Sequence, residues 1–298
     1  MNTTRLIQLR RHAPKAAALA FAALVSQAHA AIELTSGQLS YQQNFDSLPN
    51  QNGSDPAWSN DSTLPGWSIF VGPSLEQSVS QLRVSTSSGS DRAYISYGLN
   101  GDSDRALGSQ GGSSHRYNDS EAPATGEMFG AMAVSFLNGT QASLSGFSFD
   151  YTGEQWHVSS NANTAHSLTV QYALGDVGTA FNQLSWLDFS ADQQNASGVH
   201  FFTPTLSGGT NGNGNLAANR VTGLGASVTG LDWQAGQALW LRWVDINDPA
   251  SDHGMAIDNF SLSVTPVPEP ETYGMLLAGL GLVGLMQRRR LRRGAAVA

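Results

Sequence analysis

Apolar and polar side chains alternate with a period of two along several stretches in the middle of the chain. Residues 167–172 read Ser-Leu-Thr-Val-Gln-Tyr, in which every second side chain is apolar. Residues 147–151 repeat this pattern, and residues 132–136 follow it less regularly. Because successive side chains of a β-strand point to opposite faces, these stretches predict strands that are buried on one face.

The remaining pattern of the central region also favours β-structure. Residues 237–246 are apolar on both faces, which predicts a strand covered on each side. Loops rich in Gly, Asn, Ser and Asp, such as residues 98–104 and 207–215, separate the strands. No stretch between Ala31 and Thr265 predicts a long amphipathic helix. We therefore expect an all-β fold over residues 31–265: a single antiparallel, jelly-roll-like β-sandwich.

The amino-terminal residues 1–30 differ from this pattern. Four basic residues precede an alanine-rich apolar run at residues 16–25, and Ala28-His29-Ala30 follows. This arrangement is typical of a secretory signal peptide with a small-residue cleavage site. We expect a signal helix that is removed, so that the mature chain begins at Ala31.

The carboxyl-terminal residues 266–298 have three parts. The proline-rich stretch Val267-Pro268-Glu269-Pro270 is followed by fourteen uncharged residues, 273–286, and then by five arginines. A bilayer span usually needs about 20 apolar residues, so this segment predicts a short transmembrane helix that requires tilt or local thinning. Arginines beyond the helix would hold that end in the cytoplasm and leave the β-domain outside.

These residues resemble the PEP-CTERM sorting signal of Gram-negative bacteria. The resemblance rests on Val267, Pro268, Glu269 and Pro270, the short Gly/Leu-rich segment and the arginine cluster. It implies export through the Sec machinery, transient anchoring in the membrane and processing by an exosortase. It further implies a final location at the cell surface or in the extracellular matrix, with a role in the exopolysaccharide of a biofilm.

Charge and cysteine content limit the binding partners and metal ligands that the region between the two terminal segments can have. Residues 31–271 carry six arginines and all 23 acidic residues, so the formal charge of this region is near −17. Such a charge opposes binding to nucleic acid or anionic lipid and favours divalent cations. The chain has no cysteine. The domain must therefore fold on its hydrophobic core, and any metal ligands must be oxygen atoms or imidazoles.

Candidate calcium ligands lie near the end of the predicted domain. Asp245 shares its strand phase with core-type residues, and Asp258 shares the phase of Phe260 and Leu262. A carboxylate that faces the core needs a hydrogen-bonding partner, an ion pair or a metal. With the loop between them, these positions supply oxygen ligands of the kind that calcium prefers: Asp245, Asn247, Asp248, Asp252 and Asp258. Their spacing is not that of an EF-hand, and Asx turns explain the loop equally well.

Residues 239–248 and 253–260 resemble the closing strands of secreted bacterial jelly-roll domains, including MAM-like modules. Shorter matches occur at residues 44–49, 64–67 and 153–156. This resemblance implies the fold rather than an activity.

Motifs for catalysis are mostly missing from the sequence. It contains no Gly-x-Ser-x-Gly, His-Glu-x-x-His or phosphate-binding glycine motif, and its five histidines outside the signal have no recognised metal-ligand spacing. We therefore expect a non-enzymatic protein. A calcium-dependent carbohydrate-binding module is the first alternative, with Trp58 and Trp67 expected to be exposed and Glu154 and Trp156 as further ligand-binding candidates. A glycosidase-like hydrolase built on Glu154 and a second carboxylate is the other alternative.

Overall fold

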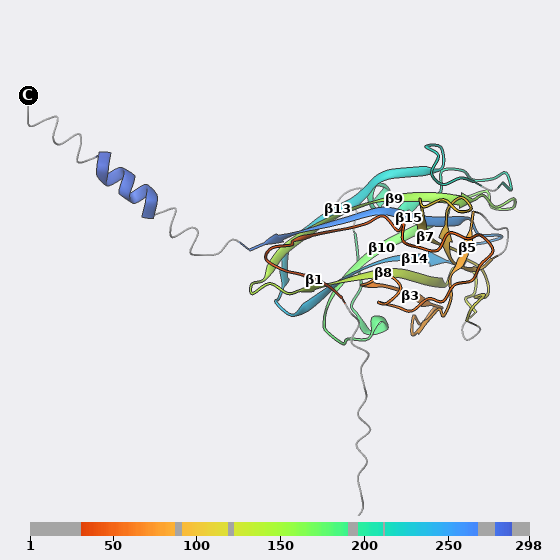
Figure 1. Cartoon of the computed structure of the whole chain (residues 1–298), viewed down its shortest axis with the longest axis horizontal. Helices are drawn as coiled ribbons and strands as arrows, with labels where there is room; N and C mark the ends of the chain where they lie inside the picture. Colours follow the sequence, from red (N-terminus) through yellow and green to blue (C-terminus); the bar gives the residue numbers. More distant parts are fainter. Residues whose placement is uncertain are drawn as a thin grey trace, which may run out of the picture.

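Two β-sheets pack face to face (Figure 1). Between them lie the side chains that the period-two pattern marks as apolar. The structure is a computed structural model that describes residues 31–86, 91–118, 122–189, 196–210, 212–267 and 278–287. Within these residues the fold is an all-β sandwich, which confirms the predicted class.

The first sheet has eight strands among the described residues, with β11-β10-β14-β8-β3-β4 as its main order. Strand β1 pairs with β8 in parallel, and β12 pairs with β10. The strands are β1 (Ile32–Leu34), β3 (Trp67–Val71), β4 (Gln77–Ser78), β8 (Met128–Asn138), β10 (Ser167–Asp176), β11 (Leu187–Asp188), β12 (Phe201–Phe202) and β14 (Gln237–Ile246).

The second sheet has seven strands in the described part of the chain, in the order β13-β9-β15-β7-β6-β5, and β2 pairs with β15. Its strands are β2 (Ser40–Gln43), β5 (Arg83–Ser85), β6 (Ala93–Tyr97), β7 (Ala106–Gln110), β9 (Leu144–His157), β13 (Arg220–Trp233) and β15 (Gly254–Pro266). From β7 onward the long strands alternate between the sheets: β8, β10 and β14 join the first, and β9, β13 and β15 join the second. This repeated crossing is the jelly-roll-like arrangement that was predicted.

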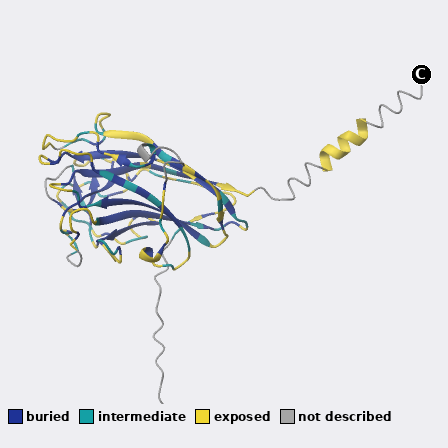
Figure 2. Cartoon of the chain, turned by 180° about the vertical axis from the view of Figure 1, so that it is seen from behind, coloured by how far each residue is buried: buried dark blue, intermediate teal, exposed yellow. Residues whose placement is uncertain are grey.

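The core between the sheets is rich in aromatic side chains. Trp67 and Trp243 stack with ring centroids 5.7 Å apart, and Phe260 packs edge-on against both rings. Leu168 and Val170 of β10 point into the same core. The strand predictions made from alternation are therefore confirmed, as Figure 2 shows by the buried interior of the sandwich.

Strand β14 is buried on both faces, as its apolar sequence predicts. Trp243 faces the core, whereas Trp240 lies on the outer face beneath the 3₁₀-helix η1 (Phe181–Gln183). Phe181 contacts the Trp240 ring at 5.5 Å and stacks on Phe70 at 3.8 Å. The loop that contains η1 thus covers the outer face of β14, whose side chains are apolar on both faces.

The helices in the described part of the chain are short. They are η1, α1 (Ala196–Val199) and a helix over residues 278–287. The last helix is exposed along its length (Figure 2), and no described helix is long and apolar enough to cross a bilayer. The predicted signal at residues 1–30 and the sorting residues Pro268, Glu269 and Pro270 lie outside the described residues, whereas Val267 is exposed just after β15.

Candidate functional site

Buried polar side chains gather where β14 ends and β15 begins. Asp245, the second-to-last residue of β14, is fully buried, which agrees with its phase in the strand. The Oδ1 atom of Asp252 accepts a 2.8 Å hydrogen bond from the backbone N–H of Asp248, which lies four residues earlier in the same loop. The side-chain amide of Asn247 instead donates to the carbonyl of Pro123 at 2.9 Å and anchors a neighbouring loop.

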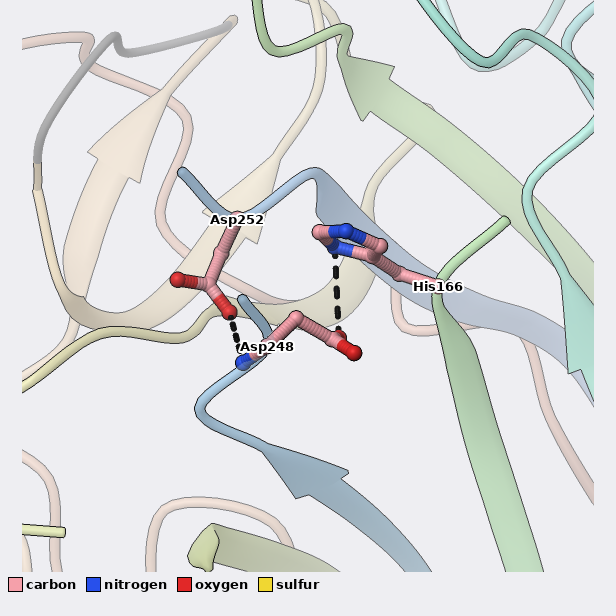
Figure 3. A group of neighbouring side chains, drawn as sticks. All are labelled: His166, Asp248 and Asp252. Atoms are coloured by element: carbon pink, nitrogen blue, oxygen red, sulfur yellow. Dashed lines mark hydrogen bonds and ion pairs between the residues drawn. The ribbon is translucent and has the colours of Figure 1, made fainter. Parts of the chain in front are cut away.

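A histidine from a distant part of the sequence completes this cluster (Figure 3). His166 precedes β10, and its Nδ1 lies 3.2 Å from Oδ2 of Asp248. One ligand atom from each of His166, Asp248 and Asp252 lies within 4.8 Å of the others. The sequence did not single out His166, because it offers there only an isolated histidine that precedes an alternating strand.

The electrostatics of this cluster follow from burial. Burial, reinforced by Asp252, raises the pKa of Asp248 to about 7, and burial raises the pKa of Asp252 to about 6. Burial and the adjacent His253 lower the pKa of His166 to about 4. At neutral pH the imidazole is therefore uncharged, so attraction between opposite charges does not hold His166 against Asp248.

Asp258 does not join the other four predicted calcium ligands. Asn259 has a positive φ of 50°, and the register of β15 against β9 shifts between Asp258 and Ser261. This bulge changes the phase of the strand, so Ile257 faces the core with Phe260. The expectation that Asp258 shares the core phase of Phe260 is wrong, because strict alternation does not continue through a bulge.

Asp258 instead belongs to a second group of carboxylates with Glu154. Burial raises the pKa of Asp258 to about 8, and the nearby Glu154 raises it further. Burial raises the pKa of Glu154 to about 7, although its Oε2 accepts a 2.8 Å hydrogen bond from the indole N–H of Trp156. The Glu154 side chain is 1% exposed, so a substrate at the surface does not reach its carboxylate without movement of the chain.

The predicted tryptophan surfaces are buried. Trp58 is 4% exposed and donates its indole N–H to Asn60, and Trp67 is fully buried in the core. The expectation that these two rings are exposed is wrong: the polar neighbours form hydrogen-bonded turns while the rings point inward. Trp156 is also fully buried and stacks on Tyr97 at 5.8 Å. These three rings offer no open face to a sugar.

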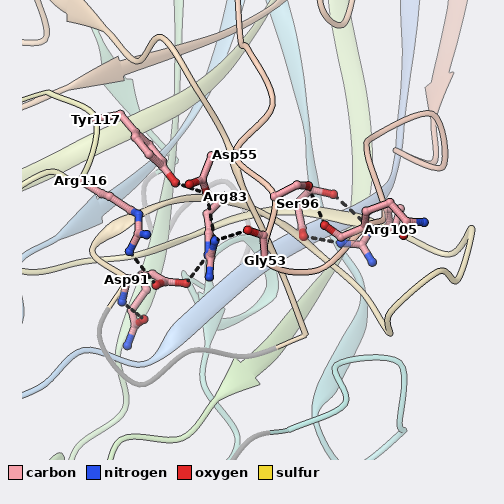
Figure 4. Close-up of polar contacts among 11 residues, drawn as sticks. Gly53, Asp55, Arg83, Asp91, Ser96, Arg105, Arg116 and Tyr117 are labelled. Atoms are coloured by element: carbon pink, nitrogen blue, oxygen red, sulfur yellow. Dashed lines mark hydrogen bonds and ion pairs between the residues drawn. The ribbon is translucent and has the colours of Figure 1, made fainter.

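Arginines in this domain mostly tie loops together (Figure 4). Arg83 contacts Asp55 at 3.0 Å and Asp91 at 3.2 Å, and Arg116 contacts Asp91 at 3.3 Å. Arg105 is 1% exposed, and burial lowers its pKa to about 10. These guanidinium groups are engaged within the fold and do not make a basic surface for a polyanion.

Among the hollows formed by the described residues, two are polar and open to solvent, which makes them candidate binding sites. The first has a volume of about 580 Å³ and lies against β2, β9 and β15. Its polar lining consists of Gln42, Gln43, Asn44, Asp150, Asn259 and Ser261. The second, of about 360 Å³, is bordered by Gln110, Gly111, Asn247 and Asp252, so it adjoins the histidine-containing cluster.

Comparison with known proteins identifies one motif. The family model of the PEP-CTERM protein-sorting motif matches residues 266–290, which confirms the predicted sorting signal. A search of curated proteins gives no significant match.

Among solved structures, the chain is similar to the CBM22-1 xylan-binding domain of Xyn10C from Paenibacillus barcinonensis. The identity is 9% and the TM-score 0.28, with 76% of this chain and 95% of that domain covered. It is also similar to TmCBM61 in complex with β-1,4-galactotriose, with 8% identity, a TM-score of 0.25 and coverage of 74% and 99%. Similarity at this level carries no argument about a ligand of this chain.

Proposed function

We propose that this chain is a non-enzymatic protein of the bacterial cell surface or extracellular matrix, associated with exopolysaccharide. The observation that carries the proposal is the PEP-CTERM motif at residues 266–290, which marks an exported, surface-sorted protein and begins where β15 ends. The sandwich before it is acidic, free of cysteine and rich in buried aromatics. These properties suit a domain that folds on its own core outside the cell.

The structure gives little support to the hydrolase alternative. A glycosidase needs two carboxyl groups that flank a bound sugar, about 5–10 Å apart. Glu154, the candidate acid or base, is buried and hydrogen-bonded to Trp156. Its raised pKa is explained by burial in the outer layer of the second sheet. A structural role for Glu154 therefore accounts for its surroundings.

Cell fractionation of the full chain tests the location. In a host that makes an exosortase, we expect the chain to lose its tail and accumulate in the surface or matrix fraction. Replacing Pro268, Glu269 and Pro270 together by alanine should leave an uncleaved chain in the membrane fraction. Ser263→Ala, at an exposed position of β15, is the matched control. Periplasmic wild-type protein, or normal sorting of the triple variant, would contradict the proposal.

Calcium-dependent carbohydrate binding is the second candidate, and the 580 Å³ hollow favours it. Its amide and carboxylate side chains match the hydroxyl groups of a sugar, and they include Asp150 and Asn259. Beside this hollow, Asp258 is 4% exposed and its Oδ1 has no hydrogen-bond partner among the described residues. A calcium ion would supply the missing partner there.

A glycan array, probed with the full chain in calcium and in chelator, tests this second candidate. We expect retention on a defined glycan in calcium, at least about tenfold weaker for Asp150→Ala, the loss of about 1.4 kcal/mol. Asp232→Ala, which changes an exposed carboxylate of β13, is the control. Equal retention of the Asp150 variant would remove the hollow as the site, and no retention on any glycan would reject carbohydrate binding.

A further inference from the structure

Strand β13 is a long strand at one end of the second sheet. It pairs only with β9 among the described residues, as Figure 1 shows at the top of the molecule. The strands at the other ends of the two sheets, β4, β5 and β11, have only two or three residues. Helix α1 packs beside β13, with Val199 in the core, but does not pair with it. The outer edge of β13 therefore offers backbone N–H and C=O groups to another strand.

The sequence of β13 lacks the side chains that usually protect such an edge. Charged residues, lysine above all, and prolines commonly prevent an edge strand from pairing with a second chain. Residues 221–231 contain no charge and no proline, and the charges lie at the two ends, on the exposed Arg220 and Asp232. Register shifts against β9 bend the strand on either side of residues 224–229, which remain in regular register. The middle of the edge is thus uncharged and extended.

We propose that β13 pairs edge to edge with β13 of a second copy of this chain, antiparallel and about a two-fold axis at Ala226. In this register Arg220 of each copy faces Asp232 of the other, so opposite charges meet at both ends of the contact. The core-facing Leu224 meets the core-facing Val228. An axis midway between two residues would set core-facing side chains beside outward-facing ones, and an axis at a neighbouring residue would separate the charges.

The outer face of this edge leaves room for the second copy. Ser227 and Thr229 are exposed there, and Figure 2 shows the exposed side of the strand. In the proposed register Ser227 faces Gly225. A Cβ atom at Gly225 would clash with the carbonyl oxygen of Phe149, so this position is restricted to glycine. Small side chains therefore line the middle of the contact and do not obstruct the approach of the second strand.

Such a pair would join two seven-stranded sheets into one continuous sheet. Each copy is strongly acidic, so long-range repulsion opposes the association. At an ionic strength of about 0.15 M this repulsion is screened beyond about 8 Å, whereas the backbone contacts remain. The contact goes beyond the proposed location and involves neither the sorting motif nor the 580 Å³ hollow. Failure of either of those proposals would leave this one to be tested separately.

Spin labelling of the full chain at this ionic strength tests the proposal, because the chain has no cysteine of its own. A mild detergent covers the exposed helix at residues 278–287. A nitroxide on Ser227→Cys should lie within roughly 15 Å of its counterpart across the axis and broaden the spectrum as the protein concentration rises. On Ser263→Cys, in β15, five strand spacings separate the two labels by roughly 24 Å, so we expect little broadening.

Charge reversal supplies the matched variants. Arg220→Asp should weaken the association at least about tenfold, because it sets like charges against each other at both ends, and the additional exchange Asp232→Arg should restore it. Arg92→Asp is the control, since it makes the same change of charge on an exposed residue next to β6, near the opposite end of the sheet. This control should associate as the wild type does. Absence of broadening at Ser227, broadening that persists in Arg220→Asp, or equal broadening at Ser263 would overturn the proposal.

Discussion

At the scale of single residues, burial dominates the chemistry of the acidic side chains. Glu154 and Asp258 lie near each other, and for both the loss of solvent is the main reason that the pKa rises. The indole N–H of Trp156 and the amide of Asn259 only partly compensate for that loss. Buried carboxyl groups of this kind make stability depend on pH in a defined direction.

Glu154 should make the protein less stable as pH rises. Its pKa is about 7 in the folded chain and near the ordinary glutamate value of 4.5 in the unfolded chain, so between these values unfolding releases a proton. In chelator, the free energy of unfolding should therefore fall from pH 5 to pH 7. Glu154→Gln, which stays neutral, should reduce this slope by up to about 1 kcal/mol per pH unit.

Denaturant titrations at several pH values measure this slope. Glu127→Gln is the control, because Glu127 is exposed and its carboxylate accepts a hydrogen bond from the backbone N–H of Ala124 in its own turn. Its slope should match the wild type. An unchanged slope for Glu154→Gln would show that Glu154 is already ionised in the folded protein.

At the scale of elements, the bulge in β15 decides which carboxylates meet. Asn259 adopts a left-handed backbone, and the strand continues on either side of it with opposite phase. Phe260 and Leu262 therefore remain in the core, while Asp258 joins Glu154. A single residue in an unusual conformation thus divides the expected five-ligand site into two groups.

Substitution of Asn259 tests this role of the bulge. Asn259→Val should lower the free energy of unfolding by about 1–2 kcal/mol more than Asn259→Gly, because a β-branched residue rarely adopts positive φ. Both variants lose the amide contact with Asp258, so their difference reports the backbone. Ser263→Val, at an exposed and extended position of the same strand, should change stability little. Equal stability of the two Asn259 variants would contradict a strained bulge.

At the scale of the whole molecule, charge and location are linked. The basic residues of the chain are concentrated at its two ends, and the sandwich between them is strongly acidic. The ends carry the predicted signal and the sorting motif, so their processing would leave a polyanionic domain outside the cell. Several of its arginines are engaged in contacts within the fold, such as Arg83 with Asp55 and Asp91. The molecule is thus better suited to cations and polar glycans than to polyanions.

Much of this organisation follows from the sequence alone, because alternation and terminal signals are local properties. Each of three features can be recognised within one short stretch of sequence: the alternation that includes Leu168 and Val170, the apolar faces of β14, and the sorting motif at residues 266–290. Tertiary structure decided what no single stretch contains. Sheet order brings His166 to Asp248, the bulge at Asn259 separates Asp258 from Asp245, and inward turns bury Trp58. Proximity across strands depends on register and backbone conformation, which a local pattern does not encode.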